Sequence, residues 1–292
     1  MYPGIRLVNE LVLFYGARLP YHPGKWRVIE ALVGAFRLRD FYAGKSFNVR
    51  RRRLSWELHP DCLVQRWLYY LSWYEHRETN WIRGRVRPGW VFFDVGANFG
   101  YYSLLVSDFS GRTAEVYAFE PFAPNHRLLN RNKALNGLER LRTFKLALSD
   151  RDGEVEFLLP KEDNLGHGRI LADEKLATPE RSVERVATTT LDVFVARHAV
   201  EKIDFIKVDI EGAEMLFLAG AAETLRRLRP ALMIECNPEG LAEFGTTADR
   251  MLKAINELGY EAYRLERSGL QPMNDARTIE DYCNLMCLPR SG

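Results

Sequence analysis

Paired cysteines are missing from this sequence. Its four cysteines, Cys62, Cys236, Cys283 and Cys287, include no Cys-x-x-Cys pair. If Cys283 and Cys287 lie on one strand, they stand about 13 Å apart, too far for a disulfide. This spacing argues against a structural zinc site and favours a reducing cytoplasm.

Long hydrophobic runs are also missing. The longest near the start, 11–15 and 31–36, fall far short of the roughly 20 residues that span a bilayer. We see no signal peptide, internal repeat or low-complexity linker. We therefore expect a folded cytoplasmic protein, with contact at the periphery of a membrane left open.

Basic residues are concentrated at the N-terminal end. Of the 292 residues, the first 59 carry eleven Lys and Arg against four Asp and Glu, although the whole chain has a net charge of only +2. We predict a basic extension with helices and a β-hairpin over 1–57, followed by the main domain over 58–292. Arg50–Arg53 suit either an edge strand, with two arginines on each face, or a surface for an anionic partner.

An aromatic cluster follows this basic stretch. Its members are Trp67, Tyr69, Tyr70, Trp73, Tyr74 and Trp81. Their helical spacing favours a core seam between two subdomains, while stacking on sugar rings is the alternative.

From Arg87 onward, short apolar runs alternate with longer helical patterns. Strands are expected in 91–95, 115–121, 141–150, 203–212, 229–238, 260–266 and 282–288. Helices are expected in 97–109, 125–137, 213–228 and 247–259. This alternation predicts an α/β fold: a mostly parallel sheet with helices on both faces.

Carboxylates stand at the ends of these strands. Because a ligand of such a sheet lies across the carboxyl ends of its strands, the side chains there form the candidate site. The strands end at Asp94, Glu120, 147–150, 207–211 and 235–237. A rim rich in acids suits a ligand with a cation and sugar hydroxyls better than a pyrophosphate.

The glycines after the first of these strands narrow the choice. Gly96 and Gly100 have a G-x-x-x-G spacing, whereas the nicotinamide fingerprint is G-x-G-x-x-G. A glycine pair alone indicates only a tight turn. Glu120, twenty positions after Gly100 and at the end of the next strand, is placed to accept hydrogen bonds from ribose hydroxyls.

Several motifs together resemble the FkbM family of S-adenosylmethionine-dependent methyltransferases. They run in order from about Leu58 to about Glu266: "DVGANFGYYS", "FEP", "LLNRNKALNG", "LALSDRDGEVEF", "TTLDVF", "IDFIKVDIEGAEMLFLAGAAETL" and "RPALMIE". The resemblance implies a class I methyltransferase, Rossmann-like fold. Its seven-stranded sheet would have an antiparallel strand in the last-but-one position. It also implies O-methylation of a sugar, glycan, glycolipid or secondary metabolite, with S-adenosylmethionine as cofactor.

The resemblance also implies a set of cofactor-binding residues. Those near the methionine part and the ribose would be Glu75, Asp94, Gly96, Ala97, Asn98, Gly100, Tyr102, Ser103, Glu120 and Pro121. Ala147, Leu148 and Ser149 would border the adenine, although Ala147 and Leu148 are equally consistent with plain core.

Four residues are candidates for the base that removes the acceptor's proton. They are Asp209, Glu211, Glu235 and His167. Glu214 is a weaker candidate, because acids in the first turn of a helix are also favoured by the helix dipole. Acids in this region and Asn237 could hold a divalent cation, but nothing in their spacing demands one, and we expect no metal.

Two other functions stay open from the sequence: a non-catalytic adaptor that keeps the fold and a nicotinamide-dependent oxidoreductase. The missing third glycine argues against the oxidoreductase, and the acids at Asp94, Glu120 and Asp209 argue against the adaptor. Nucleic acid is an improbable substrate, because the chain is not basic outside its N-terminal part. We expect a small-molecule, glycan or lipid-linked hydroxyl as acceptor, with residues 1–90 and 160–185 setting its identity.

Overall fold

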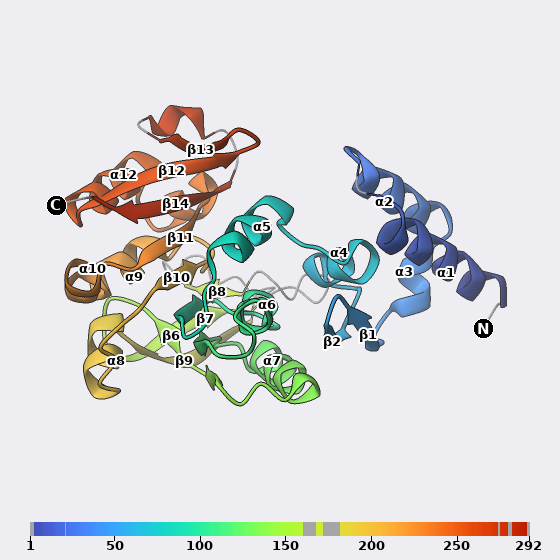
Figure 1. The fold of residues 1–292 in the computed structure, drawn as a ribbon, viewed down its shortest axis with the longest axis horizontal. Coiled ribbons are helices and arrows are strands. Elements are labelled where there is room, and N and C mark those ends of the chain that lie inside the picture. Colours follow the sequence, from blue (N-terminus) through green and yellow to red (C-terminus); the bar gives the residue numbers. More distant parts are fainter. Residues whose placement is uncertain are drawn as a thin grey trace.

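The N-terminal part forms a helical subdomain with one β-hairpin. The computed structural model describes residues 3–20, 22–159, 168–171, 182–273, 275–279 and 282–290. The first elements are α1 (Pro3–Arg18), α2 (Lys25–Ala35), α3 (Leu38–Tyr42), β1 (Phe47–Arg51), β2 (Leu54–Leu58), α4 (Leu63–Leu71) and α5 (His76–Arg85). Figure 1 shows α1, α2 and α3 at the end of the molecule away from the main sheet, with α4 and the hairpin between them and the rest.

The main sheet has eight strands in the order β13-β12-β14-β11-β10-β3-β4-β5. Their bounds are β3 (Val91–Val95), β4 (Glu115–Phe119), β5 (Leu141–Phe144), β10 (Phe205–Val208), β11 (Ala231–Cys236), β12 (Tyr260–Glu266), β13 (Gly269–Pro272) and β14 (Cys283–Pro289). The strand β14 lies antiparallel between β11 and β12, as expected. The eighth strand is β13, which forms a hairpin with β12 and extends the edge of the expected seven-stranded sheet.

A second, four-stranded sheet has the order β6-β9-β7-β8. Its strands are β6 (Ala147–Leu148), β7 (Gly153–Leu158), β8 (Arg169–Ile170) and β9 (Val183–Thr189). The single strand predicted over 141–150 is therefore wrong: it divides into β5 and β6, which belong to different sheets. The pairing of β5 with β4 stops at Phe119, two residues before Pro121, and Ala147 and Leu148 pair with β9 instead.

The helix predicted over 213–228 is also divided. It forms α9 (Glu214–Gly220) and α10 (Ala222–Leu228). The carboxylate of Asp192 accepts hydrogen bonds from the backbone N–H groups of Glu223 (3.1 Å) and Thr224 (2.7 Å), and so caps the start of α10. A side chain from α8 (Leu191–Arg197) thus caps a helix whose start the local sequence does not indicate.

Helices cover both faces of the main sheet. The remaining ones are α6 (Tyr101–Phe109), α7 (Ala123–Asn136), α8 (Leu191–Arg197), α11 (Pro238–Glu243), α12 (Ala248–Glu257) and the 3₁₀ turn η2 (Ala276–Thr278). Neighbouring strand residues point to opposite faces: Phe92 and Phe205 belong to one buried cluster, Phe93 and Ile206 to the other. In Figure 1, α5, α6 and α7 lie on the face toward the N-terminal subdomain, and α8, α9 and α10 on the opposite face.

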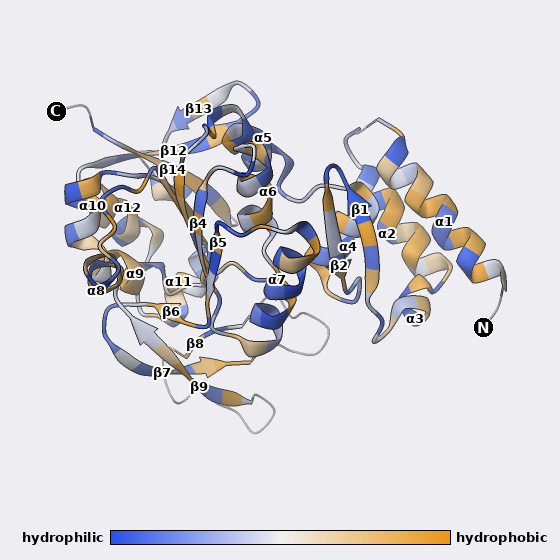
Figure 2. Ribbon diagram, turned by 60° about the horizontal axis from the view of Figure 1, so that its bottom comes forward, coloured by the Kyte–Doolittle hydropathy of each residue, from blue (hydrophilic) through white to orange (hydrophobic). Residues whose placement is uncertain are grey.

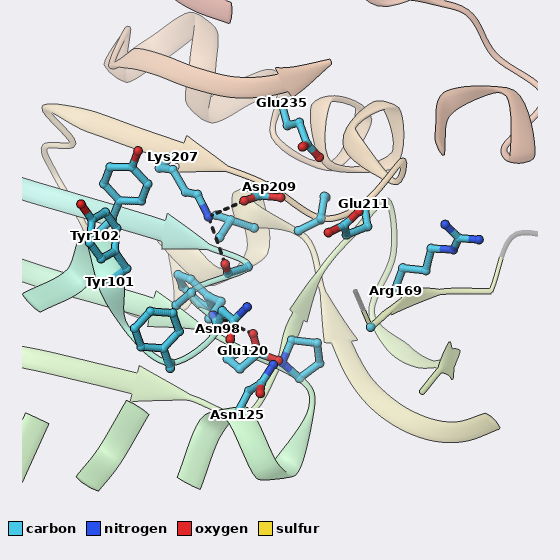
Figure 3. Close-up of a pocket in the computed structure, with 18 of the residues that line it drawn as sticks. Asn98, Tyr101, Tyr102, Glu120, Asn125, Arg169, Lys207, Asp209, Glu211 and Glu235 are labelled. Atoms are coloured by element: carbon cyan, nitrogen blue, oxygen red, sulfur yellow. Dashed lines mark hydrogen bonds and ion pairs between the residues drawn. The ribbon is translucent and has the colours of Figure 1, made fainter. Parts of the chain in front are cut away.

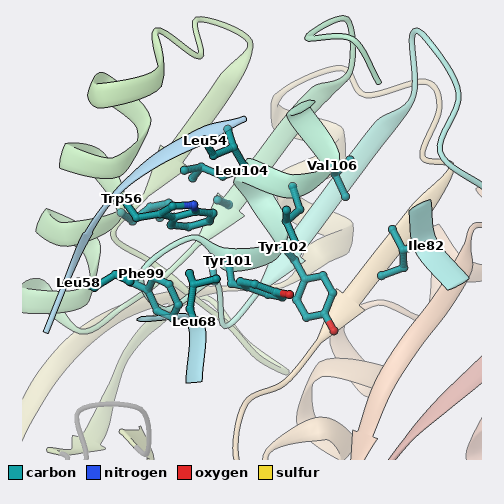
Figure 4. Close-up of a cluster of buried hydrophobic side chains, with 14 of the residues drawn as sticks. Leu54, Trp56, Leu58, Leu68, Ile82, Phe99, Tyr101, Tyr102, Leu104 and Val106 are labelled. Carbon is teal, nitrogen blue, oxygen red and sulfur yellow. The ribbon is translucent and has the colours of Figure 1, made fainter. Parts of the chain in front are cut away.

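The N-terminal subdomain packs directly on the sheet domain. The ring of Trp56 on β2 lies 5.9 Å from that of Phe99 and 6.2 Å from that of Tyr101, centroid to centroid (Figure 4). The side-chain amides of Asn132 and Asn136 on α7 bond to the backbone of β2. The hydrophobic core is continuous across the predicted boundary at residue 57, which stays a prediction.

The four consecutive arginines do not form one alternating strand, so that expectation is wrong. Arg50 and Arg51 end β1, and Arg52 and Arg53 make the turn to β2, with a left-handed backbone at Arg52 (φ 56°). Arg51 donates hydrogen bonds to the carbonyl of Tyr69, and the Arg52 guanidinium lies over the ring of Trp73. Hairpin pairing and these aromatic contacts, rather than simple alternation, orient the side chains.

Candidate active site

A strained turn links β3 to α6. The backbone N–H groups of Gly96 and Ala97 donate to the carbonyl of Phe119, at 3.0 and 2.9 Å. Gly96, Asn98 and Gly100 all have positive φ values. A Cβ atom on Gly96 would lie 1.8 Å from the backbone oxygen of Asp209, so this position admits only glycine. The turn is therefore pressed against the end of β10.

Glu120 holds this turn from the end of β4. One carboxylate oxygen accepts the N–H of Asn98 (2.8 Å), and the other accepts the N–H of Phe122 (2.9 Å). Burial raises the pKa of Glu120 to about 7, although these two hydrogen bonds oppose the shift. Glu120 also lines the cavity described below, and each of its oxygens retains a second lone pair that can accept a hydroxyl.

Lys207 lines the cavity and was not among the site residues predicted from the sequence. Its ammonium nitrogen lies 3.1 Å from the carbonyl oxygen of Gly96, 3.2 Å from an oxygen of Asp209 and 3.8 Å from one of Asp94. Burial lowers its pKa, but the carboxylates of Asp209 and Asp94 outweigh burial, so the net shift is upward and the cation persists. The signal was available, since a lysine inside an otherwise apolar strand needs partners.

Asp94 and Ser103 lie behind the turn rather than in the cavity. Both are fully buried, and the Ser103 hydroxyl donates to Asp94 at 2.6 Å. Burial raises the pKa of Asp94, while Lys207 acts in the opposite direction. Both residues tie the start of α6 to the end of β3, which fixes the shape of the turn.

Three carboxyl groups face the cavity from the ends of β10 and β11. They belong to Asp209, Glu211 and Glu235 (Figure 3). One oxygen of Glu235 is buried and has no hydrogen-bond partner among the described residues. Burial, reinforced by Asp209 and Glu211, raises the pKa of Glu235 well above its usual range. Burial therefore disfavours the charged form of the Glu235 carboxyl.

Glu214 and Glu75 support the site from outside the cavity. Glu214 is fully buried and accepts the N–H groups of Ile210 (3.2 Å) and Gly212 (3.3 Å). Glu75 accepts the hydroxyl of Tyr102 (2.5 Å) and the amide of Asn284 (2.7 Å). Burial raises the pKa of each carboxyl to about 7. Glu214 therefore positions the backbone at Ile210 and Gly212, and Glu75 positions the side chains of Tyr102 and Asn284.

The cavity has a volume of about 250 Å³ and a lining of two kinds. Acids from the ends of β10 and β11 contribute to it, and so do the side chains of Leu63, Val64 and Trp67 from α4, which offer apolar surface. Of the aromatic cluster, Trp67 and Tyr74 line the cavity, while Tyr69, Tyr70 and Trp81 are buried in the core. The cluster thus acts mainly as a seam, with two members exposed to a ligand.

The structure brings together most of the residues predicted for the site. Those lining the cavity are Gly96, Ala97, Asn98, Tyr102, Glu120, Pro121, Ala147, Leu148, Asp209, Glu211 and Glu235. Those outside it are Glu75, Asp94, Gly100, Ser103 and Ser149. His167 lies outside the described residues, although the next residue, Gly168, lines the cavity.

Comparison with known proteins gives one family. A family model described as the methyltransferase FkbM domain matches residues 94–262. The chain is 27% identical over 154 residues to the 2-O-methyltransferase NoeI of Sinorhizobium fredii, covering 49% of this chain and 62% of that protein. It is 28% identical over 174 residues to the methyltransferase sdnD of Sordaria araneosa, covering 51% and 67%.

A third relative is much longer than this chain. The chain is 26% identical over 204 residues to the AMB antimetabolite synthetase AmbE of Pseudomonas aeruginosa, covering 60% of this chain and 10% of that protein. Among solved structures, the methyltransferase FkbM of Methylobacillus flagellatus KT is 15% identical with a TM-score of 0.43, covering 97% of this chain and 58% of that one. A SAM-dependent O-methyltransferase of Thermotoga maritima is 14% identical with a TM-score of 0.39, covering 75% and 67%.

Proposed function

The chain belongs to the FkbM methyltransferase family, whose cofactor is S-adenosylmethionine, and we propose that it methylates a hydroxyl group of a sugar, glycan, glycolipid or secondary metabolite. The observation that carries this proposal is the ion-pair network of Lys207. It joins the glycine turn after β3 to Asp209 at the rim of one cavity. Lys207 thereby fixes the distance between the turn, which we propose as the cofactor site, and Asp209, which is the candidate base.

The residues at the turn fit this cofactor. The side-chain oxygen of Asn98 is buried at the cavity and has no hydrogen-bond partner within the described ranges. We propose that the turn, with Gly96, Asn98 and Gly100, holds the methionine part, and that Glu120 accepts the ribose hydroxyls. Pro121, Ala147 and Leu148 would border the adenine, with Ser149 behind them. The acids suit the positive charges of the cofactor.

S-adenosylmethionine, when bound, would supply a methyl group carried on a sulfonium. In-line transfer of this methyl group to the acceptor oxygen would release the sulfur as a neutral thioether. We propose that Asp209 takes the proton of that oxygen. The ion pair with Lys207 fixes the position of the Asp209 carboxylate at the cavity, where it could accept a proton. Glu211 and Glu235 are the alternative bases, and the role of His167 stays a prediction.

Two features support an acceptor with both polar and apolar parts. The acids in the lining disfavour an anionic group next to the reacting hydroxyl. Leu63, Val64 and Trp67, which also line the cavity, offer apolar contact to an aglycone, acyl chain or sugar face. Contact of Arg50–Arg53 with an anionic surface also stays a proposal, and rests mainly on Arg50 and Arg53, the two exposed members.

The first test is calorimetric titration of the purified protein with S-adenosylmethionine, S-adenosylhomocysteine and NAD. We expect saturable binding of the first two and none of NAD. Glu120→Ala should weaken cofactor binding, whereas Glu139→Ala on the surface should not. NAD binding would favour an oxidoreductase, and no binding at all would favour an adaptor.

The second test is transfer of a radiolabelled methyl group to a panel of neutral sugars, glycolipids and polyketide alcohols. Label recovered in an ether linkage would establish O-methylation. Label recovered only on nitrogen or carbon would overturn the choice of a hydroxyl acceptor while leaving methyl transfer intact.

A further inference from the structure

The helix α1 carries an exposed apolar stripe that the proposed function does not use. Leu7, Leu11 and Phe14 are 63%, 59% and 59% exposed. Their spacing of four and three residues places them along one side of the helix. The opposite side is buried and includes Asn9 and Val12. Because α1 already packs through its inner face, its outer stripe is free for another contact.

Exposed apolar side chains gather in this part of the molecule. Among the described residues, large exposed hydrophobic side chains are concentrated on the N-terminal helices and their connections: Leu7, Leu11, Phe14, Leu19, Val28 and Phe36. Much of α1 and α2 is coloured as hydrophobic in Figure 2. Single exposed apolar residues are normal on soluble proteins, but such a concentration indicates an interaction surface.

Exposed arginines accompany the stripe on α1 and on the neighbouring helix α2. Arg6 and Arg18 are exposed on α1, and Arg27 is exposed on α2. None of these three makes an ion pair with any residue that the structure describes. Glu10 is the acidic residue of α1, so arginines outnumber acids on this helix. An apolar stripe with unpaired arginines matches the interface of an anionic bilayer, where acyl chains meet negative headgroups.

The stripe is coupled to the cavity through α4. The Asn9 amide donates to the hydroxyl of Tyr69 (3.0 Å) and accepts from that of Tyr70 (2.7 Å). Gly16 lies so close to α4 that an added Cβ would stand 2.3 Å from the carbonyl oxygen of Tyr70. Since α4 also supplies Leu63, Val64 and Trp67 to the cavity, α1 is packed directly on a helix that lines the cavity.

We propose that α1 docks this protein on the surface of an anionic lipid bilayer. Leu7, Leu11 and Phe14 enter the boundary between headgroups and acyl chains, and Arg6 and Arg18 contact the anionic headgroups. Figure 1 shows α1 at the outer end of the molecule, where a flat surface can approach it. Docking there holds the cavity at a fixed orientation to the membrane, which suits an amphiphilic acceptor.

Vesicle sedimentation tests this proposal without any methyl transfer. The full chain should bind vesicles of phosphatidylcholine with 30% phosphatidylglycerol, and should bind pure phosphatidylcholine at least tenfold more weakly. Binding should decrease as salt is raised. Leu11→Asp and Phe14→Asp should each weaken binding by about tenfold or more, and Arg6→Glu and Arg18→Glu by about fivefold each.

Leu135→Asp is the matched control. Leu135 is an exposed leucine on α7, outside the N-terminal helices, and its substitution should leave binding unchanged. Thermal melting of each variant separates lost docking from lost folding. Because Leu11 and Phe14 are largely exposed, their variants should melt like the unmodified protein.

Three outcomes would overturn the proposal. The first is a lack of binding to anionic vesicles at low salt. The second is binding that survives Leu11→Asp and Phe14→Asp but is lost in Arg50→Glu with Arg53→Glu, which would move the contact to the hairpin. The third is a dimer, measured by light scattering, that Leu11→Asp dissociates while vesicle binding persists. In that case a second copy covers the stripe.

Discussion

The ammonium nitrogen of Lys207 lies 3.2 Å from a carboxylate oxygen of Asp209. The same nitrogen donates to the carbonyl of Gly96, so one buried cation links the glycine turn to the candidate base. The side chains of Lys207 and Asp94 are almost fully buried, and the exposed fraction of Asp209 is 27%. Removing one partner of a buried charge pair leaves the other charge uncompensated, which strongly destabilises the folded protein.

Removal of the Lys207 cation should destabilise the protein. Lys207→Met leaves Asp94 buried without a counter-charge, and the free energy of unfolding should fall by about 3–5 kcal/mol in urea titrations. Lys253→Met, at an exposed lysine paired with Glu257, should change it by no more than about 0.5 kcal/mol. Equal effects of the two substitutions would show that the Lys207 network stabilises the folded protein no more than an exposed ion pair does.

The turn should reject any side chain at Gly96. Gly96 and Gly89 have nearly equal φ values, 78° and 74°, but only at Gly96 would a Cβ meet the backbone. Gly89→Ala should therefore cost only the strain of a left-handed backbone, about 1–2 kcal/mol. Gly96→Ala should cost clearly more and abolish cofactor binding in calorimetry. Similar melting temperatures for the two variants would contradict the close packing of Gly96 on Asp209.

Stability should depend on pH through Glu214. Burial raises the pKa of this carboxyl from 4.5 to about 7, so between these values the folded protein keeps a proton that the unfolded chain has released. Its contribution to the free energy of unfolding is therefore complete below pH 4.5 and is lost as the pH rises through 7. Glu75 and Glu120, whose pKa values are also raised to about 7, act in the same direction.

Glu214→Gln isolates that contribution. The glutamine oxygen can still accept from Ile210 and Gly212, but it does not ionise. Urea unfolding should show the variant close to the unmodified protein at pH 5 and more stable by about 1–3 kcal/mol at pH 8. Glu223→Gln, on the surface of α10, should change neither value. A Glu214→Gln protein that is less stable at pH 8 would refute the buried neutral carboxyl.

Two isosteric substitutions distinguish the candidate bases. Burial raises the pKa of Glu235 well above its usual range and so disfavours the charged form that a base requires, and Glu235→Gln should leave the rate of methyl transfer within a few-fold of normal. Asp209→Asn removes the proposed proton acceptor and should lower the rate by about 10²–10⁴, with cofactor affinity nearly unchanged. Once an acceptor is known, steady-state kinetics and calorimetry measure both effects. The reverse result would assign the base to Glu235.

Membrane attachment by a spanning helix is not indicated by the structure. Across the described residues, every helix is too short or too polar to cross a bilayer. The proposed contact of α1 is a different mode, in which the exposed face of one helix lies on the membrane surface.

The sequence by itself determined the positions of the main-sheet strands other than β13, the turn at Gly96 and Gly100 and the acids at the strand ends. These features depend on short-range physics: side-chain alternation, the backbone freedom of glycine and the way that parallel strands end at one edge. They sufficed to place Glu120, Asp209 and Glu235 around one cavity.

Tertiary structure alone decided which distant groups meet. Asp192 caps the start of α10, β13 lengthens the sheet, and α4 contributes to the cavity lining. Asp94 lies behind the turn, whereas Glu120 lines the cavity. Each of these outcomes requires the positions of residues far apart in the chain. Lys207 is the clearest case. The strand that carries it can be predicted from neighbouring residues, but its carboxylate partner Asp94 lies 113 positions away in the sequence. Burial without that partner would make its charge unfavourable.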